Sequence, residues 1–302
     1  MNLQYGSFFK YPRKAFKYFL SGIYPLVIRI YPLPKVKSIP ETIDKILVDK
    51  VSICRFGDGE LLYISEKRSL QFQKQDKRLR DYFIKILKSN HEHILVGLPI
   101  GYQSLTNLRK SSKILWKAII SWTYPGVYKY LDHNKQYYNA SMTRLYMDYE
   151  NTSHSQEWFT KVRSIWDNKD IILIEGEKSR LGVGNDLFQN ARSLKRILGP
   201  AFNAFDQFDN LLNFSLNLPK DTLILVALGP TAKPLCFELA LAGFQAIDIG
   251  NLDVEYEWFL RGVKEKVKIP GKFVNEAKGG KIVEDVIDYT YINQIIAKFL
   301  ND

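Results

Sequence analysis

The chain has 302 residues, of which 46% are hydrophobic, 14% aromatic and 25% charged, and its formal net charge is +11. This composition is typical of a globular protein with one or two domains and excludes a disordered chain. Cys54 and Cys236 fall in expected regular elements and no secretory signal is evident, so we expect no disulfide framework and a cytoplasmic location.

The first 40 residues carry seven basic side chains and no acid, interspersed with aromatic residues. Their uncharged run, residues 18–28, is 11 residues long, whereas a helix needs about 20 to span a bilayer. Such a segment can lie on the anionic inner face of the plasma membrane as a peripheral anchor, with each base contributing about 1 kcal/mol. The alternative is a strap packed across the domain with its lysines in solvent. We therefore divide the chain into a basic aromatic segment, 1–40, and a folded domain, 41–302.

The positive charge is concentrated in two places, with +7 in residues 1–40 and +5 in residues 261–281, and the remaining residues sum to −1. A groove for nucleic acid needs lysines and arginines among the folded elements, interleaved with stacking aromatic side chains. The distribution therefore argues against a nucleic-acid partner.

The folded region alternates apolar runs with helical patterns. Strands are expected at residues 51–54, 94–98, 139–144, 171–174, 196–198, 223–228 and 246–249, and helices at 41–49, 77–88, 114–131 with a break at Pro125-Gly126, and 156–166. Apolar strands separated by helices indicate a parallel sheet covered on both faces. The predicted fold class is α/β, with a Rossmann-like, mostly parallel sheet whose strand-end loops gather along one edge.

The strongest candidate site follows the first strand, in the sequence Arg55-Phe56-Gly57-Asp58-Gly59-Glu60. Asp58 and Glu60 are two residues apart, so both carboxylates can face one hard cation and leave positions open for a ligand's phosphates. The flanking glycines free the backbone to turn sharply. The alternative is that both acids only cap the N-terminus of a following helix.

A second candidate site is Leu228-Gly229-Pro230-Thr231-Ala232-Lys233, where a strand leads into a helix. Gly229 permits close backbone approach and Pro230 suits the first helical turn. Free backbone amides, the Thr231 hydroxyl and the Lys233 ammonium could together hold a diphosphate. The spacing of a P-loop is absent, and a simple helix that starts with proline is the alternative.

The loop of residues 175–186 also follows a buried strand, and it is too long and too polar to be a minimal connection. Long loops at strand ends are usually functional. Its glycines, Glu177, Asn185 and Asp186 suit the hydroxyls of a sugar or ribose, although a solvated loop would have the same composition.

Three acids, Asp253, Glu255 and Glu257, follow the last predicted strand. In an extended segment all three face one way; in a helix Asp253 and Glu257 share a face and Glu255 is a surface residue. One of them could be a catalytic base. Glu255 is the first choice, because repulsion from its two neighbours in an extended turn would raise its pKa.

In this order the loops resemble the GT-D type of bacterial glycosyltransferases, over nearly the whole folded region. The matching stretches are residues 55–60, 182–187, 228–233, 246–250 and 253–258. The resemblance implies a Rossmann-like fold with an Asp-x-Glu metal motif, here Asp58 and Glu60, which handles a nucleotide sugar, usually a UDP-hexose with Mn²⁺, or Mg²⁺ instead. Asn251 stands where the family often has histidine, so a function of that imidazole is not expected here.

The implied function is transfer of a hexose from a nucleotide diphosphate sugar to a glycan acceptor, lipid-linked or on a glycoprotein, in surface polysaccharide or glycoprotein biosynthesis. The residues expected to bind the donor are Arg55, Gly57, Glu177, Asn185, Asp186, Gly229, Pro230, Thr231, Lys233 and Asp248. Two other functions stay open. One is a metal-dependent phosphodiesterase that uses the same carboxylates, and the other is a non-catalytic sugar-nucleotide binding protein at the membrane surface.

Overall fold

The computed structural model describes residues 10–66, 69–285 and 287–301. Within these residues, nine strands form one sheet in the order β1-β4-β3-β2-β8-β7-β5-β6-β9, and all neighbouring strands are parallel. The strands are β1 (Lys35–Val36), β2 (Ser52–Arg55), β3 (Ile94–Leu98), β4 (Gln136–Asn139), β5 (Asp170–Gly176), β6 (Ser193–Gly199), β7 (Leu223–Ala227), β8 (Ala246–Asp248) and β9 (Ile295–Lys298). The predicted α/β fold is confirmed.

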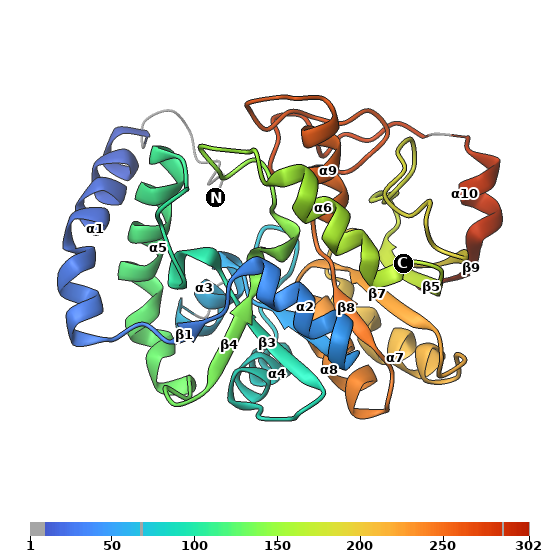
Figure 1. Cartoon of the computed structure of the whole chain (residues 1–302), viewed down its shortest axis with the longest axis horizontal. Helices are drawn as coiled ribbons and strands as arrows, with labels where there is room; N and C mark the ends of the chain where they lie inside the picture. Colours follow the sequence, from blue (N-terminus) through green and yellow to red (C-terminus); the bar gives the residue numbers. More distant parts are fainter. Residues whose placement is uncertain (1–9, 67–68, 286, 302) are drawn as a thin grey trace.

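Helices cover both faces of the sheet (Figure 1). They are α1 (Lys10–Ile30), α2 (Ile39–Asp49), α3 (Asp58–Glu66), α4 (Lys77–Lys88), α5 (Lys110–Val127), α6 (Ser155–Arg163), α7 (Phe208–Leu216), α8 (Ala232–Leu241), α9 (Leu252–Leu260) and α10 (Tyr289–Gln294). One hydrophobic core includes side chains of α2, α6 and α9, and the other includes side chains of α4, α7 and α8. Ile53 and Cys54 of β2 point into different cores, as successive residues of a strand must.

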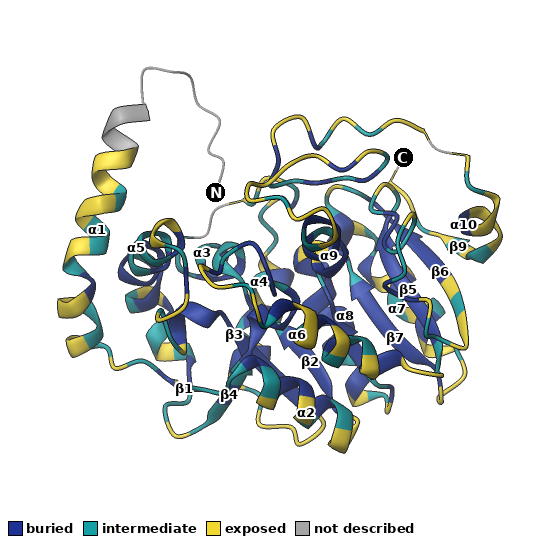
Figure 2. Cartoon of the chain, turned by 45° about the horizontal axis from the view of Figure 1, so that its top comes forward, coloured by how far each residue is buried: buried dark blue, intermediate teal, exposed yellow. Residues whose placement is uncertain are grey.

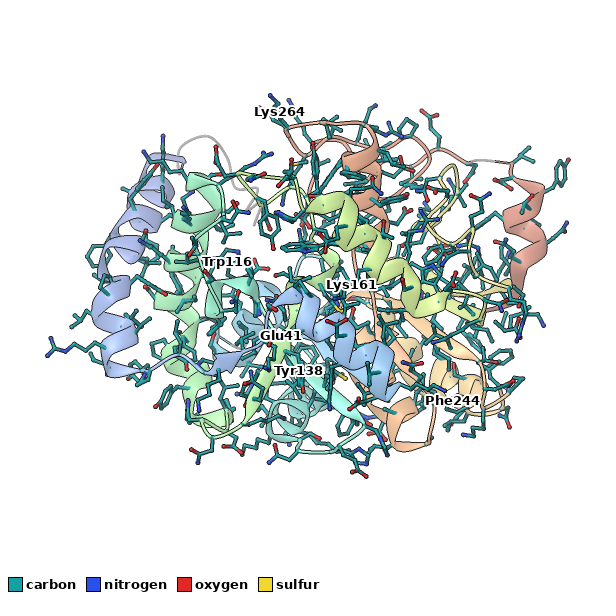
Figure 3. All side chains as sticks on the ribbon, viewed as in Figure 1. Glu41, Trp116, Tyr138, Lys161, Phe244 and Lys264 are labelled. Atoms are coloured by element: carbon teal, nitrogen blue, oxygen red, sulfur yellow. The ribbon has the colours of Figure 1, made fainter. Side chains whose placement is uncertain are left out.

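Local side-chain chemistry sets where α2 begins and how it is held. Ser38 and Glu41 form a capping box, in which the Glu41 amide donates to Ser38 Oγ and the Ser38 amide donates to Glu41 Oε2 at 2.9 Å. Lys161 of α6 donates to Asp44 of α2 at 2.8 Å, which joins the two helices on this face; Figure 3 labels Glu41 and Lys161.

The prediction was correct to the residue for α4 and β3 and wrong in two places near α5 and β4. The expected strand at 139–144 is instead β4 followed by a 3-10 turn, Ala140–Thr143, which starts because the Asn139 side chain accepts a hydrogen bond from the Ser141 amide at 3.0 Å. The expected break at Pro125 is also wrong, because α5 continues through this residue in its last turn and ends at Val127.

Residues 10–30 of the N-terminal segment form helix α1, which packs on the domain. Helix α1 lies along α5, where Tyr24 enters the core and the Phe16 ring meets Trp122 edge-to-face with centroids 4.8 Å apart. Residues 1–9 of the proposed anchor lie outside the described residues. The outer face of α1 is exposed (Figure 2). In the part of the chain that is described, no helix is long and apolar enough to cross a membrane.

The sheet reverses its strand order between β2 and β8. From β2 the chain proceeds outward through β3 and β4 on one side, whereas β8, β7, β5 and β6 lie on the other. Strands β2 and β8 share a single register pair, Ile53 with Ile247. Open α/β sheets bind ligands in the crevice outside the carboxyl ends of their strands at such a reversal. We therefore locate the candidate site at the carboxyl ends of β2 and β8.

A buried ion pair holds the neighbouring strands β5 and β6 together: Arg196 Nη1 lies 2.5 Å from Glu175 Oε1, and both side chains are almost fully buried. Arg196→Met should lower the free energy of unfolding by about 3–5 kcal/mol, because it leaves the Glu175 carboxylate buried and unpaired. Urea unfolding measures this loss. The double variant Glu175→Gln/Arg196→Met should be more stable than Arg196→Met alone; an equal or larger loss would contradict the explanation.

Candidate active site

Arg55 and Asp248 fill the point where the strand order reverses. Arg55 Nη2 lies 2.9 Å from Asp248 Oδ1, and its Nε donates to the Asp248 carbonyl at 2.5 Å. The same guanidinium donates through Nη1 to the Ala140 carbonyl at 2.7 Å and to Thr143 Oγ1 at 2.5 Å. Gly250 has φ +43°, and a Cβ there would collide with the Arg55 guanidinium, so this turn requires glycine. The predicted residues Arg55 and Asp248 are thus brought together.

Lys233 extends this cluster from α8 to the start of α3. Its ammonium lies 2.7 Å from Glu60 Oε1 and 3.5 Å from Asp248 Oδ2, and it donates to the Gly229 carbonyl at 3.2 Å. Burial disfavours the charged ammonium, but Asp248 and Glu60 outweigh this effect and raise the pKa of Lys233. With Arg55, these side chains form a buried cluster of two cations and two carboxylates.

Asp58 and Glu60 both lie in the first turn of α3 but differ in their contacts. Glu60 Oε2 accepts the Gly57 amide at 2.8 Å, so Glu60 does cap the helix start, and its Oε1 pairs with Lys233. The Asp58 side chain makes no hydrogen bond or ion pair with any other described residue. Among the described residues, no three His, Cys, Asp or Glu side chains are grouped to hold a metal ion. Asp58 is therefore the carboxylate that is free for a ligand.

The Gly229 segment is a 3-10 turn, Gly229–Thr231, that leads directly into α8. Gly229 has φ +54°, and a Cβ there would come within 2.8 Å of the Phe72 ring. The space that the missing side chain of Gly229 leaves is therefore taken by the Phe72 ring. The Thr231 hydroxyl is buried and has no hydrogen-bond partner among the described residues. The diphosphate role of Gly229, Pro230, Thr231 and Lys233 stays a prediction.

Asp253 and Glu257 share one face of helix α9, so the extended interpretation of this segment is wrong. Asn185 Nδ2 donates to Asp253 Oδ1 at 2.7 Å and to Glu257 Oε1 at 2.8 Å, and the Lys272 ammonium lies 2.7 Å and 3.1 Å from the two carboxylates. Arg261 pairs with Glu257 Oε2 at 3.0 Å. Burial opposes ionisation of Glu257, but Lys272 and Asn185 outweigh it and lower the pKa. Each of the four carboxylate oxygens of Asp253 and Glu257 therefore has a hydrogen-bond or ion-pair partner.

Glu177 and Asp186, the two acids of the loop at 175–186 that were predicted to bind the donor, differ in their contacts. Asp186 accepts from Arg163 Nη1 at 2.9 Å and from the Tyr256 hydroxyl at 2.7 Å, which ties it to α6 and α9. Glu177 follows β5, its amide donates to the Gly199 carbonyl at 2.9 Å, and its half-buried carboxylate pairs with no other described residue. Of these two predicted donor-binding residues, only Glu177 has a free carboxylate.

Glu255 is fully buried, contrary to the expectation that a helical Glu255 would be a surface residue. Its Oε2 accepts the Tyr146 and Met147 amides at 3.2 and 3.0 Å. Its Oε1 has no hydrogen-bond partner among the described residues and lies 3.7 Å from Arg144 Nη1. Burial raises the pKa of Glu255 to about 7, although Arg144 opposes this rise. The raised pKa thus comes mainly from burial, and the acids that add to it are Asp148 and Glu276 rather than the predicted neighbours Asp253 and Glu257.

A covering segment, residues 263–284, lies over the carboxyl edge of the sheet next to α9, at the top of Figure 1. It begins near Lys264, labelled in Figure 3, whose carbonyl accepts from Arg109 Nη1 at 2.6 Å. Farther along, Glu276 pairs with both terminal nitrogens of Arg144, one of them at 3.2 Å. Sequence reasoning missed these contacts, because residues 261–281 appeared only as a cluster of positive charge and Arg144 was assigned to a strand.

Comparison with known proteins shows to which family this chain belongs. Residues 53–277 match the model of the family described as glycosyltransferase GT-D fold. The chain belongs to the GT-D glycosyltransferase fold family. The match spans the loops that carry Asp58, Lys233 and Glu255, and it includes the covering segment as far as Ala277.

Two relatives of this chain carry glycosyltransferase names. The chain is 36% identical over 268 residues to "Glycosyltransferase GlyD" of Streptococcus pneumoniae serotype 4 and 33% identical to "Probable glycosyl transferase Gly" of Streptococcus gordonii. These matches cover 88% of this chain but only 33% and 39% of the relatives, so the chain spans about a third of the length of one relative and about two fifths of the other.

Two solved structures resemble this GT-D chain along almost their whole length. A structure described as the domain of unknown function 1792 with a distinct glycosyltransferase fold superposes with a TM-score of 0.84 at 32% identity, covering 95% of this chain and 99% of that one. A glycosyltransferase of the same domain type from Streptococcus sanguinis gives a TM-score of 0.82 at 33% identity, covering 88% and 99%.

Proposed function

We propose that this GT-D chain transfers a hexose from a nucleotide diphosphate sugar, a UDP-hexose, to a glycan acceptor in surface polysaccharide or glycoprotein biosynthesis. The observation that carries the proposal is Asp58, an unpaired carboxylate at the reversal point of a parallel sheet in a glycosyltransferase fold. A diphosphate would lie between this carboxylate and the Gly229–Thr231 turn, because both follow strands that end at the same edge.

A divalent cation, Mn²⁺ or Mg²⁺, fits this position. Asp58 offers two free oxygens, and Glu60 Oε1 can accept a second contact besides Lys233. One or two carboxylates suffice for such an ion when phosphate oxygens and water complete its coordination. The bound ion would neutralise the charge that develops on the leaving diphosphate.

We further propose that the reaction inverts and that Glu255 is its base. The acceptor oxygen bonds the anomeric carbon while the bond from that carbon to the diphosphate breaks, and the diphosphate leaves with the electron pair. Glu255 receives the hydroxyl proton on Oε1, which is the one oxygen among Asp253, Glu255 and Glu257 without a hydrogen-bond partner in the described structure. Because Glu255 is buried, a local rearrangement has to open a path for the acceptor hydroxyl to Oε1.

One assay tests the function. The purified protein is incubated with Mn²⁺, a panel of sugar nucleotides and candidate glycan acceptors, hydrolysis and transfer are followed by mass spectrometry, and nucleotide binding is measured by calorimetry. We expect UDP-hexose binding and sugar transfer. Binding without turnover would indicate a non-catalytic binding protein, and cleavage of phosphodiesters without sugar-nucleotide binding would indicate a phosphodiesterase.

The outer face of α1 supports a membrane-surface location for this activity. Phe19, Leu26 and Ile30 recur at helical spacing on this face, and each is about 60% exposed. Lys14 and Arg29 are exposed on the same helix, and residues 1–40 contain no acid. An apolar stripe flanked by bases is typical of a helix that lies in the interface of an anionic bilayer. We propose that α1 holds the enzyme at the inner face of the plasma membrane, near a lipid-linked acceptor.

The triple variant Phe19→Ser/Leu26→Ser/Ile30→Ser should bind anionic vesicles more than about tenfold more weakly, because each exposed side chain would otherwise bury apolar area in the bilayer. Vesicle co-sedimentation measures this loss. The matched double variant Val48→Ser/Leu241→Ser removes exposed apolar residues from α2 and α8 and should bind as the wild type does. Equal vesicle binding by the triple variant and the wild type would overturn the membrane proposal.

A further inference from the structure

Arg144 stands between two carboxylates that compete for it. Both of its terminal nitrogens pair with Glu276 of the covering segment, and its Nη1 is 3.7 Å from Glu255 Oε1, too far for a hydrogen bond. Glu276 also pairs with Lys266 and accepts from Asn251 Nδ2 at 2.8 Å. The guanidinium is thus held on Glu276, and Glu255 Oε1 has only a long ion pair with Arg144 and no hydrogen-bond partner among the described residues.

The other groups around Glu255 do not take the place of Arg144. The Tyr146 and Met147 amides both bond Oε2 and do not satisfy Oε1. Asp148 contributes a repulsive negative charge, and burial and nearby negative charge keep the Tyr149 hydroxyl neutral by raising its pKa. Arg144 is therefore the one cation among the described residues placed to pair with the free oxygen of Glu255.

We propose that Glu276 is a positioning residue: by binding Arg144 it keeps Oε1 of Glu255 free of a hydrogen bond and able to accept a proton from the acceptor hydroxyl. This inference rests on the proposed function, in which Glu255 is the base. Glu276 itself stays ionised through the working range. Burial alone would favour its protonated form, but Arg144 and Lys266 outweigh it and hold the pKa of Glu276 well below its usual value.

Removing the charge of Glu276 should let Arg144 move closer to Glu255 and form a hydrogen-bonded ion pair with Oε1. An opposite charge at contact distance lowers a carboxyl pKa by about 1–3 units. In Glu276→Gln the acidic limb of the transfer rate against pH should therefore move down by at least about one pH unit, and the plateau rate should fall because the base is weaker. Arg144→Gln should move the limb in the opposite direction, because Glu255 then loses its nearest cation.

Glu265→Gln is the matched control. Glu265 lies in the same covering segment and is exposed, and its side chain makes no hydrogen bond or ion pair with another described residue, so the pH profile of Glu265→Gln should coincide with that of the wild type. Circular dichroism melts establish that each variant is folded before its rates are compared.

The pH dependence of thermal stability reports the protonation of the Glu255 carboxyl without any donor sugar. The pKa of Glu255 rises on folding from 4.5 to about 7, so its protonated form stabilises the fold below pH 4.5. This stability is lost as the pH rises from 4.5 to 7. The decline should end at least about one pH unit lower in Glu276→Gln and extend to higher pH in Arg144→Gln.

The two readouts separate the inference from the proposed function. If the wild type transfers no sugar, the proposed function fails, while the melting curves still show whether Glu276 holds Arg144 away from Glu255. A folded Glu276→Gln variant whose acidic limb and melting curve both match those of the wild type would overturn the inference. A lower plateau rate with an unshifted limb would equally overturn it, because a merely structural role of Glu276 has that result.

Discussion

Replacing Asp58 with asparagine should lower glycosyl transfer at least about a hundredfold and lower the free energy of unfolding by no more than about 1 kcal/mol. The variant keeps the volume of the side chain but removes the charge that would hold the cation. Because the Asp58 side chain pairs with no other described residue, the variant loses only the favourable interaction of this charge with the N-terminus of α3. Initial rates with Mn²⁺ and a UDP-hexose measure the effect, and calorimetry of Mn²⁺ binding in the presence of UDP measures its cause.

Two comparisons make the Asp58 result specific. Asp221→Asn removes an exposed carboxylate before the amino end of β7, far along the strand from the carboxyl edge, and should keep wild-type rates. Glu60→Gln should lower both the activity and the free energy of unfolding, because it removes a partner of the buried Lys233. The loss of stability should not exceed the value of about 3–5 kcal/mol that is typical of a broken buried ion pair. A wild-type rate in Asp58→Asn would remove the metal assignment.

The fold was predictable where a single segment carries its own signal. Strand β3 is a continuous buried apolar run, and α4 repeats its buried side chains at helical spacing, so both were predicted to the residue. Strands β1 and β9 are short and lie at the two edges of the sheet, so their sequences lack such a run. Met142 and Thr143 are buried in a 3-10 turn, and buried residues outside regular elements look like a strand in the sequence.

The same difference applies to the site. The predicted loops do meet at one edge, because parallel strands all end there. What each acid contacts was not predictable, since Lys233 reaches Glu60 and Lys272 reaches Asp253 only in the folded chain. Residues 261–281 were noted only as a concentration of positive charge, whereas Lys272 of this segment is buried against α9. Local spacing identifies candidate carboxylates, and the tertiary contacts decide which of them is free.

Glu255→Gln should abolish transfer, by at least about a hundredfold, while UDP binding is retained. Glutamine has nearly the same shape, and its carbonyl can still accept the Tyr146 and Met147 amides, so the loss reflects the missing base. Because the pKa of Glu255 is about 7, the wild-type rate should rise with pH through neutrality as this carboxyl loses its proton. Transfer rates from pH 5 to 9 and calorimetric UDP binding measure the two parts.

Glu257→Gln is the comparison that decides between the acids of α9. Its carboxylate already pairs with Lys272 and Arg261, so this variant should lose stability but keep transfer within about tenfold of the wild type. A wild-type rate in Glu255→Gln would contradict the assignment of Glu255 as the base and favour Glu257 or Asp253 instead. A joint loss of transfer and UDP binding in Glu255→Gln would show that Glu255 only supports the backbone of residues 146–147, because a base that acts on the acceptor has no reason to weaken the donor.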